Sequence, residues 1–372
     1  MAPTTIPIPD DLFDEWMALP VREQSADPRF EIERIPPERY EAVYDCVDDA
    51  FGRRRDRVLY DWLYRKNPYG LARIWTTTEV ATGRILKTGA FFPWPIWRGD
   101  QPRAGSLSGD SATVQEWQRK GLAKDRRRVR RSHPMSSTFA TIAGPNEGSR
   151  AVATKAGEDS QMVGELTGGV AVLGGGDLGR RVGLPNMLAR PVGAVAGGLF
   201  AAWRRASLRS GRGLRFEVVD RCPAEFDAIT LATMRFEHWW TPHNAVFLDW
   251  RYVDHPKETY QPVALVDPAT DAPVAYAIVR LAGAQSTLAE FAASPEAAPA
   301  LLAHAVGFAR AAGAESMNFF STPIWRHWPL FRRAGFLPYR TDNYLDAMDW
   351  KDKDYSEDIT RWQITPGDRD YH

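Results

Sequence analysis

DWLYRKNP at residues 61–68 recurs as DWRYVDHP at residues 249–256, and the two share the pattern D-W-x-Y-x-x-[N/H]-P. The turn ATGR (81–84) and the segment ATDA (269–272) stand 188 positions apart, the same offset as the first pair. Two separate motifs that agree in their offset indicate a duplication inside the chain. The sequence therefore predicts two copies of one fold.

The order of expected strands and helices is also similar in the two copies. Alternating apolar and polar residues predict strands, and apolar residues at helical spacing predict helices. The first copy gives a strand at 29–35, a helix at 36–52, strands within 72–97 and 104–114, and a helix after Gly121. The second gives a strand at 216–220, a helix at 223–240, a hairpin at 260–283, a strand at 286–294, a helix at 296–313, a strand at 315–322, and a short helix and final strand at 328–340.

The expected fold class is α+β, with two tandem domains that are each a mixed, mostly antiparallel sheet flanked by helices. The expected parts are an N-terminal arm (1–28), a first domain (29–165), a linker rich in glycine and arginine (166–213), a second domain (214–350) and a C-terminal tail (351–372).

Composition limits the classes of protein that the chain can belong to. Hydrophobic residues make up 44% and charged residues 25% of its 372 residues, which is typical of a globular protein with a sizeable core. Lysine plus arginine and aspartate plus glutamate are both 47, and this balance argues against a dedicated nucleic-acid-binding protein. Cys46 and Cys222 are too few for a disulfide framework and fit a reducing compartment.

We expect a cytoplasmic protein that carries no metal. The N-terminus lacks the basic and apolar regions of a signal peptide, and no apolar run reaches the roughly 20 residues of a membrane span. The histidines show no zinc spacing; those considered are His133, His243, His255, His304 and His327.

The basic segment WQRKGLAKDRRRVRR (117–131) directly follows an expected strand and holds Gln118, Gly121 and Ala123 in the spacing Q-x-x-G-x-A. The first N–H groups of a helix lack internal partners, and the helix dipole adds partial positive charge there. A glycine and a small residue let an anion approach that backbone, and the basic side chains attract phosphate. Alone, the pattern is more typical of a solvated helix start. Its context favours a phosphate-binding loop.

That context resembles the GNAT acyltransferase family, whose pyrophosphate loop reads Q/R-x-x-G-x-G/A between the fourth strand and the third helix. The segment FATIAGPNEGSRAVATKAG (139–157) is similar to the family's fifth strand, asparagine and short helix, and PLFRRAGFLPY (329–339) is similar to its closing helix and strand. The resemblance covers about residues 29–157 and 214–348. It implies transfer of an acyl group from an acyl-CoA, or from an acyl carrier protein, to an amine.

By this resemblance one acyl-CoA site is expected, in the first copy. Its pyrophosphate ligands would be Gln118, Arg119, Lys120, Gly121, Leu122 and Ala123. The backbone of Thr113 and Val114 would pair with the pantetheine arm, and Asn146 would meet the cofactor. The second copy has SPEAAPALL (294–302) in place of the loop, and it is expected to shape the acceptor pocket. The family's tyrosine acid is replaced in both copies, by Ala153 and by Phe331.

The general base stays open at the level of sequence. A protonated amine must lose a proton before it attacks a thioester, either to a side chain or through water. The catalytic candidates are Asp110 on the strand before the loop, Glu290 on the equivalent strand of the second copy, and His238 in EHWW (237–240). A histidine titrates near neutral pH, which suits proton transfer. Each of the three also fits an ordinary structural role.

The linker contains two further patterns. Gly174-x-Gly176-x-x-Gly179 matches a dinucleotide fingerprint, but Pro185 and Pro191 interrupt the helix that the fingerprint needs, so a glycine-rich connector is expected. LARPVGAVAGGLFAAWRRASLRSGRGLR (188–215) joins apolar residues to arginines. It fits a segment lying on an anionic membrane surface, at the inner face of the membrane, or a linker helix packed between the two domains.

Three functions follow from these observations. The first is an N-acyltransferase; a lipid acceptor would suit a bacterial ceramide synthase that acylates a sphingoid base, and a nucleotide sugar or small amine fits equally well. The second is a non-catalytic binding or scaffold protein on a doubled GNAT fold. The third is aminoacyl transfer from a charged transfer RNA, known on the same doubled fold, which would not need residues 118–123 as a phosphate loop.

Overall fold

The structure, a computed structural model, describes residues 5–6, 8–17, 22–122, 140–144, 161–174, 176, 183, 185–208, 213–234, 237–349 and 358–368. The chain forms two compact units, and neither is continuous in sequence. The N-terminal unit holds residues 8–164, 344–357 and 369–372, and the C-terminal unit holds residues 1–7, 165–343 and 358–368. Two of the boundaries, 164/165 and 343/344, fall inside strands.

The N-terminal unit is a mostly antiparallel sheet that carries helices. Its elements are η1 (Asp10–Met17), β1 (Arg22–Gln24), β2 (Phe30–Ile35), η2 (Pro37–Arg39), α1 (Tyr40–Phe51), α2 (Arg57–Arg65), β3 (Arg73–Glu79), β4 (Ile85–Arg98), β5 (Gln101–Thr113), η3 (Gln115–Trp117) and β6 (Ala140–Ala143). The strands lie in the order β1-β2-β3-β4-β5-β6, and only β5 and β6 pair in parallel. Helix α1 buries Tyr40, Val43, Tyr44 and Val47 at helical spacing and ends at Gly52, whose φ of 63° lets the chain turn away.

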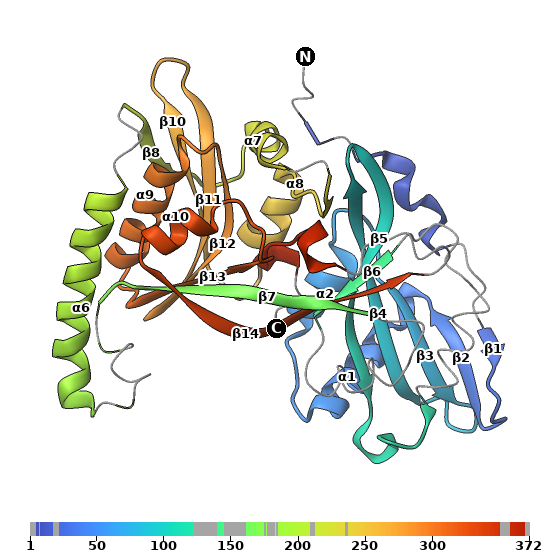
Figure 1. The fold of residues 1–372 in the computed structure, drawn as a ribbon. Helices are drawn as coiled ribbons and strands as arrows, with labels where there is room; N and C mark the ends of the chain where they lie inside the picture. Colours follow the sequence, from blue (N-terminus) through green and yellow to red (C-terminus); the bar gives the residue numbers. More distant parts are fainter. Residues whose placement is uncertain are drawn as a thin grey trace. The chain divides into compact units, whose positions relative to one another are not determined.

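The C-terminal unit repeats this plan. Its elements are α6 (Asn186–Ser207), β8 (Arg215–Val218), α7 (Glu225–Thr233), β9 (Trp239–Trp240), α8 (Ala245–Leu248), the π-helical turn η4 (Asp249–Val253), β10 (Tyr260–Asp267), β11 (Ala272–Ala282), β12 (Gln285–Ala293), α9 (Ala298–Ala311), β13 (Ser316–Ser321), α10 (Trp328–Arg333), η5 (Ile359–Arg361), β15 (Trp362–Gln363) and η6 (Pro366–Asp368). Strands β8, β10, β11, β12 and β13 are neighbours in that order, and only β12 and β13 pair in parallel among them (Figure 1).

Helices cover both faces of the C-terminal sheet. Ala275 and Ala277 of β11 belong to one buried cluster with Leu301 and Val306 of α9. Tyr276 lies between the two alanines and therefore points to the opposite face, where its ring stacks on Phe226 of α7 at 4.2 Å between centroids. The sheet is thus buried on both sides, which explains its nearly continuous apolar strands.

The two copies exchange their last strands. Strand β7 (Gln161–Val172) follows the first copy, but its residues 167–172 pair antiparallel with β13 in the C-terminal unit. Strand β14 (Phe336–Asp349) closes the second copy, but its residues 346–349 pair antiparallel with β6 in the N-terminal unit. The expected domain ranges, 29–165 and 214–350, treat each copy as a continuous segment and do not include this exchange.

The duplication is confirmed in the backbone as well as in the order of elements. Asp56 caps α2 by accepting a bond from the Val58 N–H, and Asn244, 188 positions later, caps α8 by accepting one from the Phe247 N–H. Gly83 and Asp271, with the same offset, both adopt left-handed φ values, 70° and 54°, in the hairpins β3–β4 and β10–β11. The same backbone conformations therefore recur where the sequence pattern recurs.

The expected interruption of the linker helix by Pro191 is wrong. Helix α6 begins after Pro185 and continues through Pro191 to Ser207. Proline removes one helical hydrogen bond, and the 22-residue helix tolerates that loss because α6 is docked on the C-terminal unit. Gly197 lies so close to the end of β7 that a Cβ atom there would sit 2.5 Å from the Cα of Gly174.

The two adjacent glycines of α6 give a matched test of this docking. We expect Gly197→Ala to destabilise the protein by about 1–3 kcal/mol, because the added carbon meets backbone that cannot move aside. Gly198→Ala faces open space and should stabilise the protein by about 0.5–1 kcal/mol through its helix propensity. Urea unfolding followed by circular dichroism measures both. A gain in both variants would contradict the close contact between α6 and β7.

Candidate functional site

The basic segment that follows β5 forms an exposed turn in the N-terminal unit. Strand β5 ends at Thr113, η3 follows, and residues 118–121 are exposed. Arg119 and Gly121 adopt left-handed backbone conformations with φ of 63° and 87°. The Gln118 side-chain amide donates to the Thr113 carbonyl at 3.2 Å, and the Lys120 ammonium lies 4.9 Å from the centre of the Trp117 ring. The turn is therefore ordered by its own side chains while its charges face solvent.

The backbone and the charges of this turn are relevant to anion binding. Left-handed residues such as Arg119 and Gly121 occur in turns whose N–H groups face one concave side and bind phosphate groups. Arg119 and Lys120 add positive charge at its surface, and Leu122 is buried and anchors its end. Ala123 and Asn146, which were also expected to meet the cofactor, lie outside the described residues.

The end of β5, directly before the basic turn, is held in place by bonds to β4. The Val114 N–H donates to the Leu86 carbonyl at 3.0 Å, and the Lys87 ammonium donates to the Thr113 hydroxyl at 2.9 Å. Strand β6 pairs with β5 only at Ser106–Ser108. Thr113 and Val114 thus lie beyond the last described pair with β6.

Asp110 lies at a β-bulge of the same strand. Asp110 and Ser111 together oppose Gly89 of β4, and Asp110 adopts a left-handed φ of 43°. Its side chain is only 2% exposed. Arg55 binds it with two bonds, of 2.8 and 3.0 Å, and the Tyr64 hydroxyl donates to it at 2.7 Å. A carboxylate at a strained backbone position is therefore held by a buried cation and a buried phenol.

The electrostatics of this cluster favour a positioning role for Asp110. Burial acts to lower the pKa of Arg55, but the Asp110 carboxylate outweighs burial and holds that pKa above its usual value. Burial, and then the charge of Asp110, raise the pKa of Tyr64, so the phenol stays a donor. The Asp110 oxygens are already engaged by two bonds from Arg55 and one from Tyr64, and this geometry favours a positioning role.

The C-terminal unit contains the equivalent cluster around Glu290. Ala289 is the extra residue of a β-bulge in β12, directly before Glu290. The Tyr252 hydroxyl donates to Glu290 Oε1 at 2.6 Å, and His243 Nδ1 lies 2.9 Å from the same oxygen. His243 and Tyr252 are offset by 188 from Arg55 and Tyr64. Sequence reasoning found the tyrosines as part of the repeat but missed that Arg55 and His243 precede them at matched positions.

A third group completes the C-terminal cluster. Asp368 Oδ1 lies 2.9 Å from His243 Nε2 and accepts a bond from the Thr241 hydroxyl, so the imidazole is held between two carboxylates. Burial alone would lower the pKa of His243, but Asp368 and Glu290 raise it to about 10. Burial would raise the pKa of Asp368, and the imidazolium instead lowers it. The histidine is therefore charged at neutral pH.

The C-terminal segment that carries Asp368 lies where β12 and β13 diverge. The two strands pair only at 285–287 with 316–318. Beyond that point the Thr365 hydroxyl donates to Glu290 of β12 at 2.9 Å, and the Ser321 hydroxyl of β13 donates to the Ile364 carbonyl at 2.7 Å. A Cβ on Gly367 would lie 2.6 Å from Glu290 Oε1. Residues 364–368 thus fill the space between the diverging strands of this unit.

A small cavity remains beside this segment. Its volume is about 20 Å³, room for a water molecule, and His243, Glu290, His327 and Thr365 are among the residues that line it. Burial, followed by the charge of Arg326, lowers the pKa of His327 to about 4, so its ring is neutral. His238 is not among the lining residues; its Nε2 lies 3.8 Å from Glu237. The structure therefore brings His243 and His327 to Glu290, and it does not bring His238 there.

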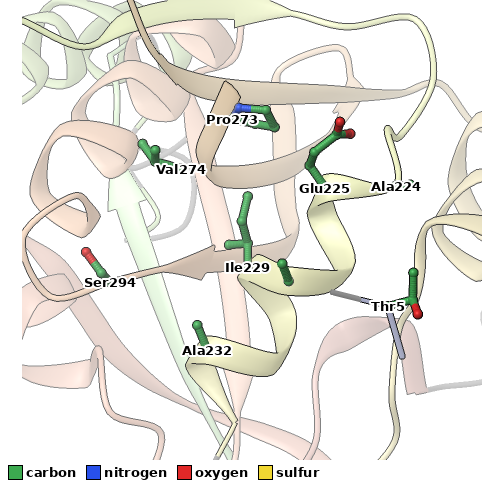
Figure 2. A pocket seen from close by; sticks show the side chains of 9 residues that line it. Thr5, Ala224, Glu225, Ile229, Ala232, Pro273, Val274 and Ser294 are labelled. Carbon is green, nitrogen blue, oxygen red and sulfur yellow. The ribbon is translucent and has the colours of Figure 1, made fainter. Parts of the chain in front are cut away.

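A larger hollow in the C-terminal unit lies elsewhere. It has a volume of about 590 Å³ and is lined mainly by α7 and by Pro273, Val274 and Ser294 (Figure 2). Apart from Thr5, Glu225 and Ser294, its lining is apolar. Glu290 and His243 are not among its lining residues, so this hollow is separate from the Glu290 cluster.

Two further expectations concern metals and membranes. Within the described parts of the chain, no group of three or more histidine, cysteine, aspartate or glutamate side chains is placed to hold a metal ion. None of the helices in those parts combines the length and apolar character needed to cross a membrane.

Known structures share this architecture. A conserved protein of unknown function from Enterococcus faecalis V583, described as a probable N-acyltransferase, superposes with a TM-score of 0.61 at 11% identity, over 86% of this chain and 73% of its own. A GCN5-related N-acetyltransferase from Anabaena variabilis ATCC 29413 gives 0.58 at 10% identity, over 86% and 72%. A tandem GNAT protein from the clavulanic acid biosynthesis pathway gives 0.51 at 14% identity, over 87% of this chain and all of its own.

These likenesses are in structure alone. No protein-family model matches the sequence, and no curated protein is similar to it in sequence. The expected fold class is confirmed: the chain is α+β and carries a tandem GNAT fold, with a mixed sheet and flanking helices.

The ion pair of Asp110 gives one test that separates structure from catalysis. We expect Asp110→Asn to lower the free energy of unfolding by about 3–5 kcal/mol, because Arg55 is left buried without its carboxylate. Asp100→Asn, at an exposed turn position, serves as the matched control and should change stability by less than about 0.5 kcal/mol. Denaturant unfolding measures both. Full stability of Asp110→Asn with lost turnover would instead identify Asp110 as the base.

The pH dependence of stability tests the His243 cluster. A pKa raised from 6.5 to about 10 contributes stability that is complete below pH 6.5 and is lost as the pH rises through 10. We expect the free energy of unfolding to fall by about 1.4 kcal/mol per pH unit within that window. His243→Gln should be less stable at pH 7 and should lack this slope. Parallel slopes for both proteins between pH 7 and 10 would contradict the cluster.

Proposed function

We propose that the protein is an acyl-CoA-dependent N-acyltransferase whose N-terminal unit binds the donor. The observation that carries the proposal is the exposed basic turn of residues 118–121, directly after the bulged strand β5 of a GNAT fold. Gln118, Arg119, Lys120 and Gly121 would hold the pyrophosphate, with Leu122 as the buried anchor. Thr113 and Val114 would offer strand edge to the pantetheine arm. An acyl carrier protein presents the same pantetheine thioester and is the alternative donor.

The reaction joins the acceptor nitrogen to the thioester carbonyl. The carbon–nitrogen bond forms, the carbon–sulfur bond breaks, and coenzyme A leaves as the thiol that takes up a proton. The attacking amine must be neutral, and Asp110 is occupied by Arg55 and Tyr64. In this proposal the amine proton leaves through water, and Asp110 fixes the bulge that shapes the end of β5. Glu290 is engaged in the same way, by Tyr252, His243 and Thr365, so it has a positioning role in this proposal; His238 stays as a candidate base to be tested by substitution.

We propose that each chain has a single donor site, because the C-terminal unit lacks room and charge for a second. At the equivalent turn of the C-terminal unit, Ser294 already accepts bonds from the first amides of α9, through its hydroxyl to Ala297 and its carbonyl to Ala298. Glu296 adds negative charge at that turn, which repels phosphate. Residues 364–368 occupy the space between the diverging strands β12 and β13 of that unit. These features support a single coenzyme A site, in the N-terminal unit.

The acceptor is proposed only as a primary amine. A lipid amine such as a sphingoid base, as in a bacterial ceramide synthase, and a small polar amine both fit the reaction. If the acceptor is a lipid amine, the enzyme would act as a peripheral protein at the inner face of a membrane. A free-thiol assay with palmitoyl-CoA and acetyl-CoA, against sphinganine and a panel of small amines, distinguishes the two versions.

A non-catalytic scaffold and a transferase that uses charged transfer RNA are the alternatives on the same fold. Neither requires the turn of residues 118–121 to bind coenzyme A. The absence of the family's tyrosine at Phe331, which is buried in α10, motivates the scaffold alternative.

Calorimetry with coenzyme A tests the donor site. We expect one equivalent to bind the unaltered protein, and Gly121→Glu to weaken binding at least about tenfold, because the new side chain is strained at a φ of 87° and repels phosphate. Gly83→Glu is the matched control, since Gly83 also has a positive φ of 70° and open space around it. It should bind as the unaltered protein does.

Two results would overturn the proposal. If the unaltered protein binds neither coenzyme A nor palmitoyl-CoA, the scaffold or transfer-RNA alternatives are favoured. If two equivalents bind with equal affinity, the C-terminal unit also holds a donor site and residues 364–368 do not exclude it.

A further inference from the structure

The outer face of α6 is apolar along its whole length. Its exposed side chains include Met187, Leu188, Val192, Val195, Leu199 and Trp203. Val195 is 65% and Leu199 68% exposed, values that are unusual for side chains of this kind. The spacing of four, three and four residues between positions 188, 192, 195 and 199 places them on one helical stripe. A continuous exposed stripe of this kind marks a surface that binds something apolar.

The opposite face of α6 explains why the large side chains point outward. Ala189, Gly193, Gly197 and Arg204 are buried. Gly197 touches the backbone at Gly174, and Arg204 donates to the Val172 carbonyl at 3.0 Å. The helix is therefore docked on the C-terminal unit through its small residues, beside the end of β7 (Figure 1). Packing on the unit does not need the apolar stripe.

Arginines flank the stripe in the sequence. No acidic residue occurs between Asp177 and Glu217, a stretch that contains eight arginines. Arg190 and Arg205 are exposed on α6 itself. Arg332 and Arg333 of α10 are also exposed, and the Arg333 carbonyl accepts the Trp203 indole N–H at 2.7 Å. Apolar side chains, a tryptophan and flanking arginines together form the pattern of a helix that lies in a membrane interface.

We propose that α6 is a docking surface for an anionic lipid bilayer, lying in the interface with its stripe in the acyl region and its arginines at the headgroups. The charge distinguishes this occupant from a second copy of the chain, because pairing two α6 stripes would bring the exposed arginines of α6 close to one another. The inference stands on α6 alone and does not depend on the proposed acyl transfer.

Co-sedimentation of the full chain with vesicles tests the surface. We expect binding to vesicles of 30% phosphatidylglycerol in phosphatidylcholine, and weaker binding to phosphatidylcholine alone. Leu199→Glu should reduce the partition coefficient about tenfold, since one large apolar side chain leaves the acyl region. Arg205→Glu should reduce binding to the anionic vesicles and leave binding to phosphatidylcholine nearly unchanged.

Val246→Glu is the matched control, because Val246 is 63% exposed on α8 of the same unit. It should bind the anionic vesicles as the unaltered protein does. Coenzyme A titration of Leu199→Glu should be unchanged, which separates failure of this surface from failure of the donor site. Equal sedimentation of Leu199→Glu and the unaltered protein overturns the proposal. A concentration-dependent dimer without lipid, abolished by Leu199→Glu, overturns it in favour of a second copy.

Discussion

A buried carboxylate at a β-bulge, bound by a tyrosine from the repeated D-W-x-Y segment, is the interaction on which both units depend. Tyr64 reaches Asp110 and Tyr252 reaches Glu290, over 2.7 and 2.6 Å. Each bond ties a helical segment to the bulged strand of its unit, β5 or β12, and so helps to hold the bulge. Without the carboxylate the phenol would be buried without an acceptor, which is costly in an apolar core.

The two clusters differ in the cation, and this difference separates the roles of the units. Arg55 keeps its charge at every accessible pH and satisfies Asp110 through two bonds, so the N-terminal cluster needs no further group. His243 can offer one bond to each of two acceptors, and its second bond goes to Asp368. A histidine at this position therefore recruits the C-terminal segment, and that segment fills the divergence of β12 and β13. Under the proposed function, this leaves the basic turn of the N-terminal unit as the donor site.

Local patterns allowed much of the fold to be predicted, and non-local contacts limited the rest. The offset of 188 and the period of each segment predicted the duplication, the hairpins and the strand before Gly121. The exchange of β7 and β14 leaves no local signal, because a strand reads the same whichever partner it pairs with. Asp110 and Glu290 were found as carboxylates on the right strands. Arg55, which binds Asp110, and Thr365, which binds Glu290, lie 55 and 75 positions away from those carboxylates, and distance in sequence hid them.

The strand exchange also changes how the glycine-rich segment is understood. Strand β7 ends at Val172 and β8 begins at Arg215, and both belong to the C-terminal unit. The segment between them thus starts and ends on one unit, so the chain does not use it to join the two copies. A simple connection would be short and polar. Its described part instead contains α6, a helix of 22 residues whose large exposed side chains are mostly apolar and which also exposes Arg190 and Arg205. Neither the fold nor the proposed acyl-CoA site requires that side to be apolar, whereas the proposed docking on a bilayer does.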